Sequence, residues 1–147
     1  MVKSATPVFE TTAEKTGFKK TGATKKSRSY DDFQTTYPKA VHCIEFGRTP
    51  ENRPMLALVA SRAGALISKD AKAKKLPILL IQGGIHAGEI DGKDADFLAL
   101  RDTLEVPEEK SWLNQQVLIF VPVFNIDGHQ RFAAWNRPNQ RGPEEMG

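Results

Sequence analysis

The chain has a single cysteine, Cys43, among its 147 residues, so an internal disulfide is excluded. It also has no apolar run that approaches the roughly twenty residues of a membrane-spanning helix, and it shows no internal repeat. Residues 1–10 lack the apolar core of a signal peptide. The compartment therefore stays open: cytoplasmic if the start is native, and secreted or periplasmic if it has been processed.

Positive charge is concentrated at the amino terminus. Residues 1–30 contain seven Lys or Arg and two Glu, whereas the rest of the chain contains 14 basic and 16 acidic residues. Such an arm attracts phosphates and anionic surfaces, but Phe18 is the only aromatic residue in its basic stretch, and nothing there indicates a nucleic-acid reading element. We expect residues 1–29 to be a flexible leader without a specific nucleic-acid partner, and residues 30–147 to form the folded unit.

The apolar pattern predicts an α/β fold built on a mixed sheet. Strands are expected at residues 41–46 and 55–61, which flank a turn and should pair antiparallel. Continuous apolar runs at residues 78–82 and 117–123 predict two further strands, the first covered on both faces. A helix is expected between these two runs, which makes a βαβ unit with parallel strands.

The helix between these strands is predicted to run from residue 89 to about residue 104 and to be amphipathic. Its apolar face carries Phe97, Leu100 and Leu104 at helical spacing. The charged residues of its first turns lie mostly off that face; they are Lys93, Asp94 and Asp96.

The segment Gly83-Gly84-Ile-His86-Ala-Gly-Glu89 sets a histidine and a glutamate three residues apart, directly after an apolar strand. Imidazole nitrogen and carboxylate oxygen are good zinc ligands, and a catalytic zinc has three protein ligands and one open position. Gly83 and Gly84 permit a sharp turn, and residues three apart on a helical turn point to the same side. His86 and Glu89 are therefore candidate metal ligands. The same spacing also occurs by chance, with a packed histidine and a glutamate at a helix start.

Three segments, in order, resemble the zinc metallocarboxypeptidases, the peptidases of the carboxypeptidase A type. Residues 83–95 are similar to the family's first zinc-ligand motif. Residues 124–128, Phe-Asn-Ile-Asp-Gly, resemble the Asn-Pro-Asp-Gly turn after the next strand, with isoleucine in place of proline. Residues 46–53, Phe-Gly-Arg-Thr-Pro-Glu-Asn-Arg, resemble the family's early hairpin, with Asn52 in place of a glycine. The resemblance implies a mixed β-sheet with flanking helices, of which about half is present.

The resemblance implies that His86 and Glu89 bind Zn²⁺ and that a second histidine, further along, completes the ligand set. The chain has two other histidines, His42 and His129. Neither matches that position, since His42 lies in an expected strand and His129 directly follows the Asp-Gly turn. Each is by default a surface or packed imidazole.

The resemblance also implies an arginine that polarises the scissile carbonyl and stabilises its oxyanion. Arg137 fits this catalytic position better than Arg141 does, because the residues after it match the family's Arg-x-Asn pattern. Together with Asn136, Arg137 also resembles the substrate-binding pair that grips a terminal carboxylate.

Members of the family are longer, and their remaining half carries the third ligand, the carboxylate clamp and the glutamate general base. The resemblance therefore implies an amino-terminal fragment of an enzyme that hydrolyses C-terminal peptide bonds by metal-activated water. We expect the chain to be inactive alone, and its substrate class to be a peptide or peptide-like molecule. Two alternatives stay open: a zinc amidohydrolase or deacylase of related fold, and a non-catalytic binding module. The sequence does not indicate the oligomeric state.

Overall fold

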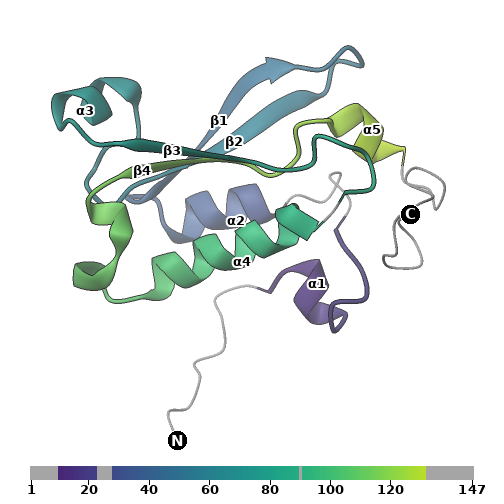
Figure 1. Ribbon diagram of the computed structural model, residues 1–147, viewed down its shortest axis with the longest axis horizontal. Helices are drawn as coiled ribbons and strands as arrows, with labels where there is room; N and C mark the ends of the chain where they lie inside the picture. Colours follow the sequence, from purple (N-terminus) through teal and green to yellow (C-terminus); the bar gives the residue numbers. More distant parts are fainter. Residues whose placement is uncertain (1–9, 23–27, 90, 132–147) are drawn as a thin grey trace, which may run out of the picture.

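The computed structural model describes residues 10–22, 28–89 and 91–131 (Figure 1). In this part of the chain four strands form one sheet with the order β1-β2-β4-β3. The strands are β1 (Val41–Arg48), β2 (Pro54–Ala60), β3 (Ile78–Gln82) and β4 (Val117–Val121). The helices are α1 (Thr12–Lys15), α2 (Arg28–Thr36), α3 (Ser68–Ala73), α4 (Asp91–Glu105) and α5 (Ile126–Gln130), with short 3-10 turns η2 (Glu108–Lys110) and η3 (Trp112–Asn114).

The sheet is mixed, as the apolar pattern predicts. β1 and β2 form an antiparallel hairpin whose register shifts between Glu45 and Gly47, and β2 is antiparallel to β4. β3 and β4 are parallel, with Ile78 opposite Val117 at one end of the pair. Because α4 connects these two strands, the predicted βαβ unit is confirmed.

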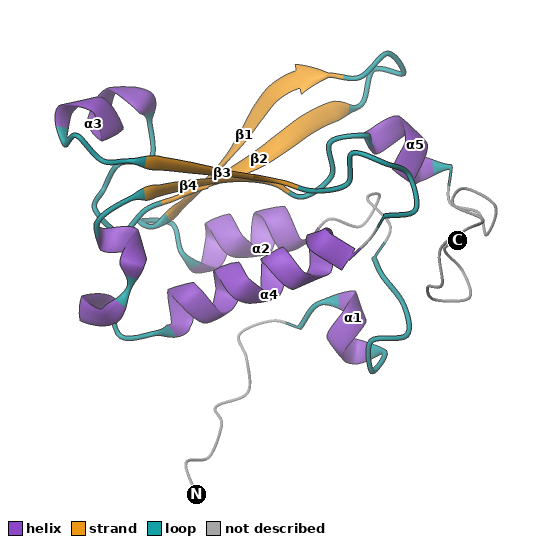
Figure 2. Ribbon diagram, in the orientation of Figure 1, coloured by secondary structure: helices purple, strands orange, loops and turns teal. Residues whose placement is uncertain are grey.

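Helices α2 and α4 cover one face of the sheet (Figure 2). The centre of this layer is Phe97 of α4, whose ring stacks on Phe33 of α2 at 5.8 Å and meets the edge of Phe120 of β4 at 5.2 Å. Burying each such ring stabilises the fold by roughly 2 kcal/mol. The predicted apolar face of α4 is confirmed, since Phe97, Leu100 and Leu104 are all buried.

A smaller apolar cluster lies apart from this main core. It joins Val59 of β2 and Val117 of β4 to Ala71 of α3 and to Ala65 in the segment that leads into that helix. The short helix α3 thus packs against β2 and β4 through this cluster.

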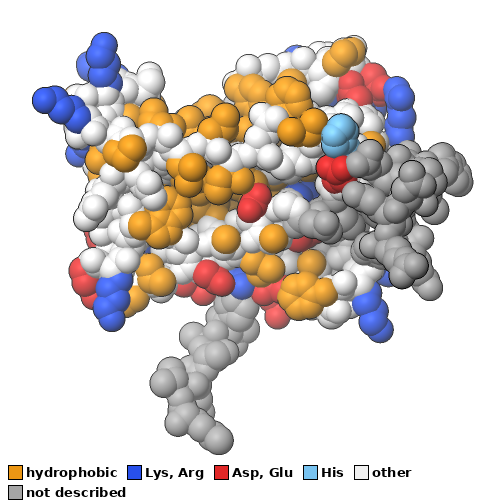
Figure 3. Space-filling model, viewed as in Figure 1, with side chains coloured by type: hydrophobic (Ala, Val, Ile, Leu, Met, Phe, Trp, Pro, Cys, Tyr) orange, Lys and Arg blue, Asp and Glu red, His pale blue; other side chains and the backbone are white. Residues whose placement is uncertain are grey.

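β3 differs from its prediction as a strand covered on both faces. Ile78, Leu79 and Leu80 are 53%, 43% and 57% exposed. Side-chain exposure depends on what packs on the faces of the sheet, and in the described ranges Ile81 is the residue of β3 that packs against the main core. β3 is also an edge strand there, paired with β4 alone. Figure 3 shows hydrophobic side chains gathered on this side of the molecule. A continuous apolar run indicated a strand correctly but did not indicate what packs on its two faces.

Part of the segment expected to be a flexible leader lies against α4. Thr11 and Glu14 form a capping box at the start of α1, and the Glu14 carboxylate pairs with buried Arg101 at 2.8 Å. Further along, Thr21 donates a hydrogen bond to Asp94. Residues 10–22 therefore contribute contacts to the folded unit. The division of the chain at residue 29 stays a prediction.

Lys93 is buried, although the amphipathic pattern placed it mostly off the apolar face of α4. Its ammonium donates to the carbonyl oxygen of Gly22, so a contact with the amino-terminal segment takes the place of solvent. In the described ranges, no helix has both the length and the apolar character needed to cross a membrane.

Candidate metal site beyond β3 and β4

His86 and Glu89 lie in the turn between the end of β3 and the start of α4. The turn is closed by the Glu89 amide, which donates to the carbonyl oxygen of His86 at 3.3 Å. His86 is exposed and Glu89 is half-buried. Helix α4 begins at Asp91, so Glu89 precedes the helix rather than starting it. The two donors are therefore joined by a tight turn instead of by one face of a helix.

Two glycines bring this turn close to the neighbouring strand. Gly84 has φ of 57°, and a Cβ atom there would meet Val123 Cα at 3.0 Å. A Cβ atom on Gly83 would lie 2.9 Å from the carbonyl oxygen of Pro122. Only glycine fits both positions without a shift of the backbone, so the sharp turn predicted at Gly83-Gly84 is present and has a packing reason.

The segment after β4 is hydrogen-bonded directly to this glycine turn. The amide of Phe124 donates to Gly83 O at 3.0 Å, and the amide of Asn125 donates to Gly84 O at 2.8 Å. The Asn125 side chain then caps α5 by accepting from the amide of Gly128 at 3.0 Å. The segments that follow the carboxyl ends of the parallel strands β3 and β4 are thus hydrogen-bonded to each other. In open α/β sheets, ligands bind beyond these ends of the strands.

The other two histidines are not part of the glycine turn that carries His86 and Glu89. His42 is exposed on β1, which is separated from β3 by two strands. His129 of α5 is buried, and burial, followed by the nearby Lys93 ammonium, lowers its pKa to about 4, against a hydrogen bond with the Gly22 backbone that raises it. A histidine in that setting is a neutral, packed imidazole.

The donor set fits a zinc ion in its chemistry, because His86 and Glu89 supply one nitrogen and one carboxylate at one turn. Among the residues that the structure describes, no group of three or more His, Cys, Asp or Glu is placed to hold a metal ion. Two donors of the right kind are therefore present. The candidate arginines Arg137 and Arg141 lie outside the described residues.

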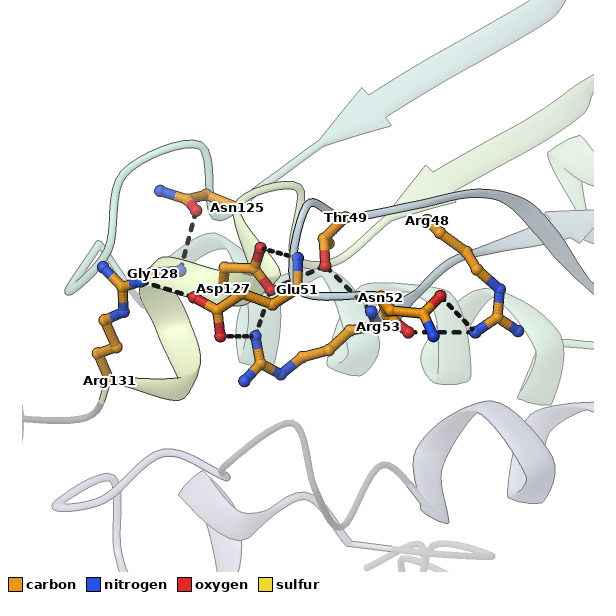
Figure 4. A network of polar contacts seen from close by, with 9 residues as sticks. All are labelled: Arg48, Thr49, Glu51, Asn52, Arg53, Asn125, Asp127, Gly128 and Arg131. Atoms are coloured by element: carbon orange, nitrogen blue, oxygen red, sulfur yellow. Dashed lines mark hydrogen bonds and ion pairs between the residues drawn. The ribbon is translucent and has the colours of Figure 1, made fainter.

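A polar network joins the β1–β2 hairpin to α5 (Figure 4). The Asp127 carboxylate accepts from Thr49 Oγ1 at 2.8 Å and from the Glu51 amide at 3.2 Å, and it pairs with the Arg53 guanidinium. Glu51 in turn pairs with Arg53 and with Arg131, each at 2.6 Å. The side chain of Asp127 is only 16% exposed, so this carboxylate lies between the two elements rather than on the surface.

The network keeps its acidic groups ionised. Burial acts to raise the pKa of Asp127, but the hydrogen bonds from Thr49 and Arg53 outweigh it, and the pKa lies below its ordinary value. The pKa of Glu51 is lowered first by Arg53 and then by Arg131. At neutral pH the network is thus a set of charge-assisted hydrogen bonds.

Both segments of this network were expected to be turns, but their contact was not predicted. The residue types are complementary, because the hairpin offers a hydroxyl and a guanidinium as donors and the turn after β4 offers a carboxylate as acceptor. Thr49 and Asp127 are 78 positions apart in the chain, so spacing along the sequence carries no information on their contact.

The described part of the chain is a mixed α/β sheet with an imidazole and a carboxylate in the turn beyond a parallel strand, and ligands bind at this position in open α/β sheets. The sequence profile of the zinc carboxypeptidases matches residues 27–145, and this chain belongs to that family. A search of curated proteins found no match.

Solved structures of carboxypeptidases resemble the fold. One is carboxypeptidase A from Helicoverpa armigera, with 21% identity and a TM-score of 0.61 over 74% of this chain and 25% of that one. Another is bovine thrombin-activatable fibrinolysis inhibitor in complex with tick carboxypeptidase inhibitor, with 22% identity and a TM-score of 0.58 over 81% and 35%. A further structure of thrombin-activatable fibrinolysis inhibitor has 17% identity and a TM-score of 0.65 over 88% and 30%. The chain thus spans between a quarter and about a third of the length of these proteins.

Proposed function

We propose that this chain contributes the amino-terminal part of a zinc-dependent metallocarboxypeptidase, in which His86 and Glu89 bind Zn²⁺. One observation carries the proposal. In a member of the zinc carboxypeptidase family, these two donors share the turn beyond β3, next to the segment that follows β4. The substrate would be a peptide or a peptide-like molecule, as the name of the inhibitor bound to one related structure suggests for that protein.

Each residue has a separate task in this proposal. His86 and Glu89 hold the ion, and the glycine turn sets the path of the backbone between them and β3. When bound, the zinc ion would supply Lewis-acid activation of a water molecule and of the scissile carbonyl. Arg137 is proposed to bind the substrate carbonyl and stabilise negative charge on its oxygen, a role that suits a guanidinium.

The experiment is a titration of the purified chain with ZnCl₂, followed by NMR of the histidine rings. The sequence has three histidines, so each signal can be assigned by substitution. We expect Zn²⁺ to shift the His86 ring signals, and His86→Ala or Glu89→Gln to weaken binding by at least about tenfold. His42→Ala is the matched control and should bind as the unsubstituted chain does. Equal shifts of all three rings, or binding that is indifferent to His86→Ala, would reject the metal site.

Activity is the second readout. We expect the 147-residue chain to release no C-terminal residues from peptides, with or without zinc, because the part of the chain that the structure describes offers two candidate donors and a catalytic zinc has three protein ligands. Zinc-dependent release by the purified chain would show that the described donors suffice and would contradict this part of the proposal.

A further inference from the structure

Asp127 is the point at which the β1–β2 hairpin holds the segment after β4. Its two oxygens accept from three groups of the hairpin, namely the Thr49 hydroxyl, the Glu51 amide and the Arg53 guanidinium. The hairpin side is itself ordered, because the Arg53 amide donates to the same Thr49 oxygen at 3.1 Å. Figure 4 shows these side chains converging on Asp127 from the turn of the hairpin.

A short path of hydrogen bonds leads from Asp127 to the candidate metal site. Asp127 lies in the first turn of α5, which is capped by the side chain of Asn125. The Asn125 amide donates to Gly84 O at 2.8 Å, and His86 follows Gly84 by two residues. A Cβ atom on Gly84 would lie only 3.0 Å from Val123 Cα, so the glycine turn runs close to the segment that follows β4. A movement of α5 would therefore be transmitted to the backbone that carries His86.

We propose that Asp127 is a positioning residue for His86: through the Thr49 and Arg53 contacts it holds the start of α5, and through Asn125 it holds the glycine turn in the geometry that binds metal. This inference rests on the proposed function. Groups that orient a metal ligand without touching the ion typically change metal affinity by about 10- to 100-fold when removed. A carboxylate suits the position because it only accepts, whereas an amide would turn a donor toward one of the three hairpin donors.

Four variants separate positioning from other effects. Asp127→Asn keeps the shape and removes the charge, and Thr49→Val removes the hydroxyl but keeps its size. Thr49→Ser is the conservative rescue, since it retains a hydroxyl that can donate to Asp127 and accept from Arg53. Glu45→Gln is the matched control, because it removes the pair of Glu45 with Arg48 at 3.0 Å in the same hairpin but does not touch Asp127.

Two measurements are made on each variant of the whole chain. The first is the ZnCl₂ titration monitored at the His86 ring, and the second is amide hydrogen exchange of Asn125 and Phe124, which needs no metal. We expect Asp127→Asn and Thr49→Val to weaken Zn²⁺ binding about tenfold or more. The same two variants should speed exchange at Asn125 and Phe124 more than at core amides such as that of Val59. Thr49→Ser and Glu45→Gln should leave both readouts unchanged.

The outcomes distinguish this inference from the proposed function. If zinc binds through His86 and Asp127→Asn changes neither affinity nor local exchange, Asp127 is not a positioning residue. A uniform rise in exchange over all amides would show a merely structural role and would also overturn the inference. If the unsubstituted chain shows no His86-dependent binding, the metal site is rejected. Selective exchange at Asn125 then still decides whether Asp127 holds the glycine turn.

Discussion

At the scale of single residues, Lys93 is the clearest case of a charge held out of water. Burial lowers its pKa from an ordinary 10.5 to about 8, against the nearby Asp94 carboxylate, which raises it. Its ammonium donates to the Gly22 carbonyl, and its positive charge helps to lower the pKa of buried His129. The folded state therefore binds the Lys93 proton more weakly than the unfolded chain does.

This difference predicts a pH dependence of stability. Between pH 8 and 10.5 the unfolded chain binds more protons at Lys93, so the free energy of unfolding should rise with pH in that window. We expect a gain of about 2 kcal/mol between pH 8 and pH 10 from this residue. Lys93→Met should lack the gain. Urea unfolding of both proteins across this range measures it.

The test is how steeply the free energy of unfolding changes with pH, and not its absolute value. The absolute value also changes because Lys93→Met removes the hydrogen bond to Gly22. Lys69 is exposed on α3, and Lys69→Met is the matched control, which should follow the pH profile of the unsubstituted chain. Parallel profiles for Lys93→Met and the unsubstituted chain would show that Lys93 is solvated in the folded protein.

At the scale of elements, an ion pair joins α1 to α4. Arg101 is 8% exposed in its side chain and Glu14 is 18% exposed, with 2.8 Å between Nη1 and Oε2. Glu14 also accepts from the Thr11 amide at 2.8 Å, so it serves the helix cap and the contact at once. A segment of four helical residues has little stability of its own. Its order therefore depends on contacts with the rest of the fold, and this ion pair is one of them.

We predict that Glu14→Ala lowers the free energy of unfolding by about 1–2 kcal/mol, because it leaves the Arg101 guanidinium buried with one partner fewer. The value is below that of a fully buried pair because Asp102, which also contacts Arg101, remains in place. Urea unfolding at pH 7 measures the change. Glu10→Ala, an exposed acidic residue of the same segment, should stay within about 0.5 kcal/mol. If both variants unfold alike, α1 is not docked through Glu14.

The strands and α4 were predictable because their information is local. Alternating or continuous apolar residues define a strand, and Phe97, Leu100 and Leu104 define a helix face, within a few residues of sequence. α1 was not predicted, since its stability depends on Arg101, far along the chain. The exposure of β3 was mispredicted for the same reason: it depends on what packs on the faces of the sheet and not on the run of Ile78, Leu79 and Leu80 itself.

The candidate site divides in the same way. The candidate donors His86 and Glu89 could be proposed from residue type and spacing, and the Gly83-Gly84 turn could be predicted from its composition. The contacts that support this turn could not be predicted, because Asp127 and Thr49 are far apart in the sequence and are brought together by the fold. Arg137 lies outside the described residues, so its role stays a prediction.

At the scale of the whole molecule, the sheet has two very different edges. β1 is partly covered, since its Cys43 amide donates to the Gln34 side chain of α2 at 2.7 Å. β3 is an edge strand in the described ranges and exposes apolar side chains on both faces. An open, apolar edge strand offers unpaired backbone groups to another chain and is a site of self-association.

We therefore predict that the isolated chain associates with increasing concentration and that Leu80→Lys suppresses this. Leu80 is 57% exposed at the centre of β3, so a lysine there removes apolar surface and places charge on the edge without entering the core. Sedimentation velocity over a concentration series measures the monomer fraction. Thr35→Lys, at an exposed position on α2, adds the same charge elsewhere and should leave association unchanged. A loss of association in both variants would assign the effect to net charge, and a loss in neither would place the contact away from β3.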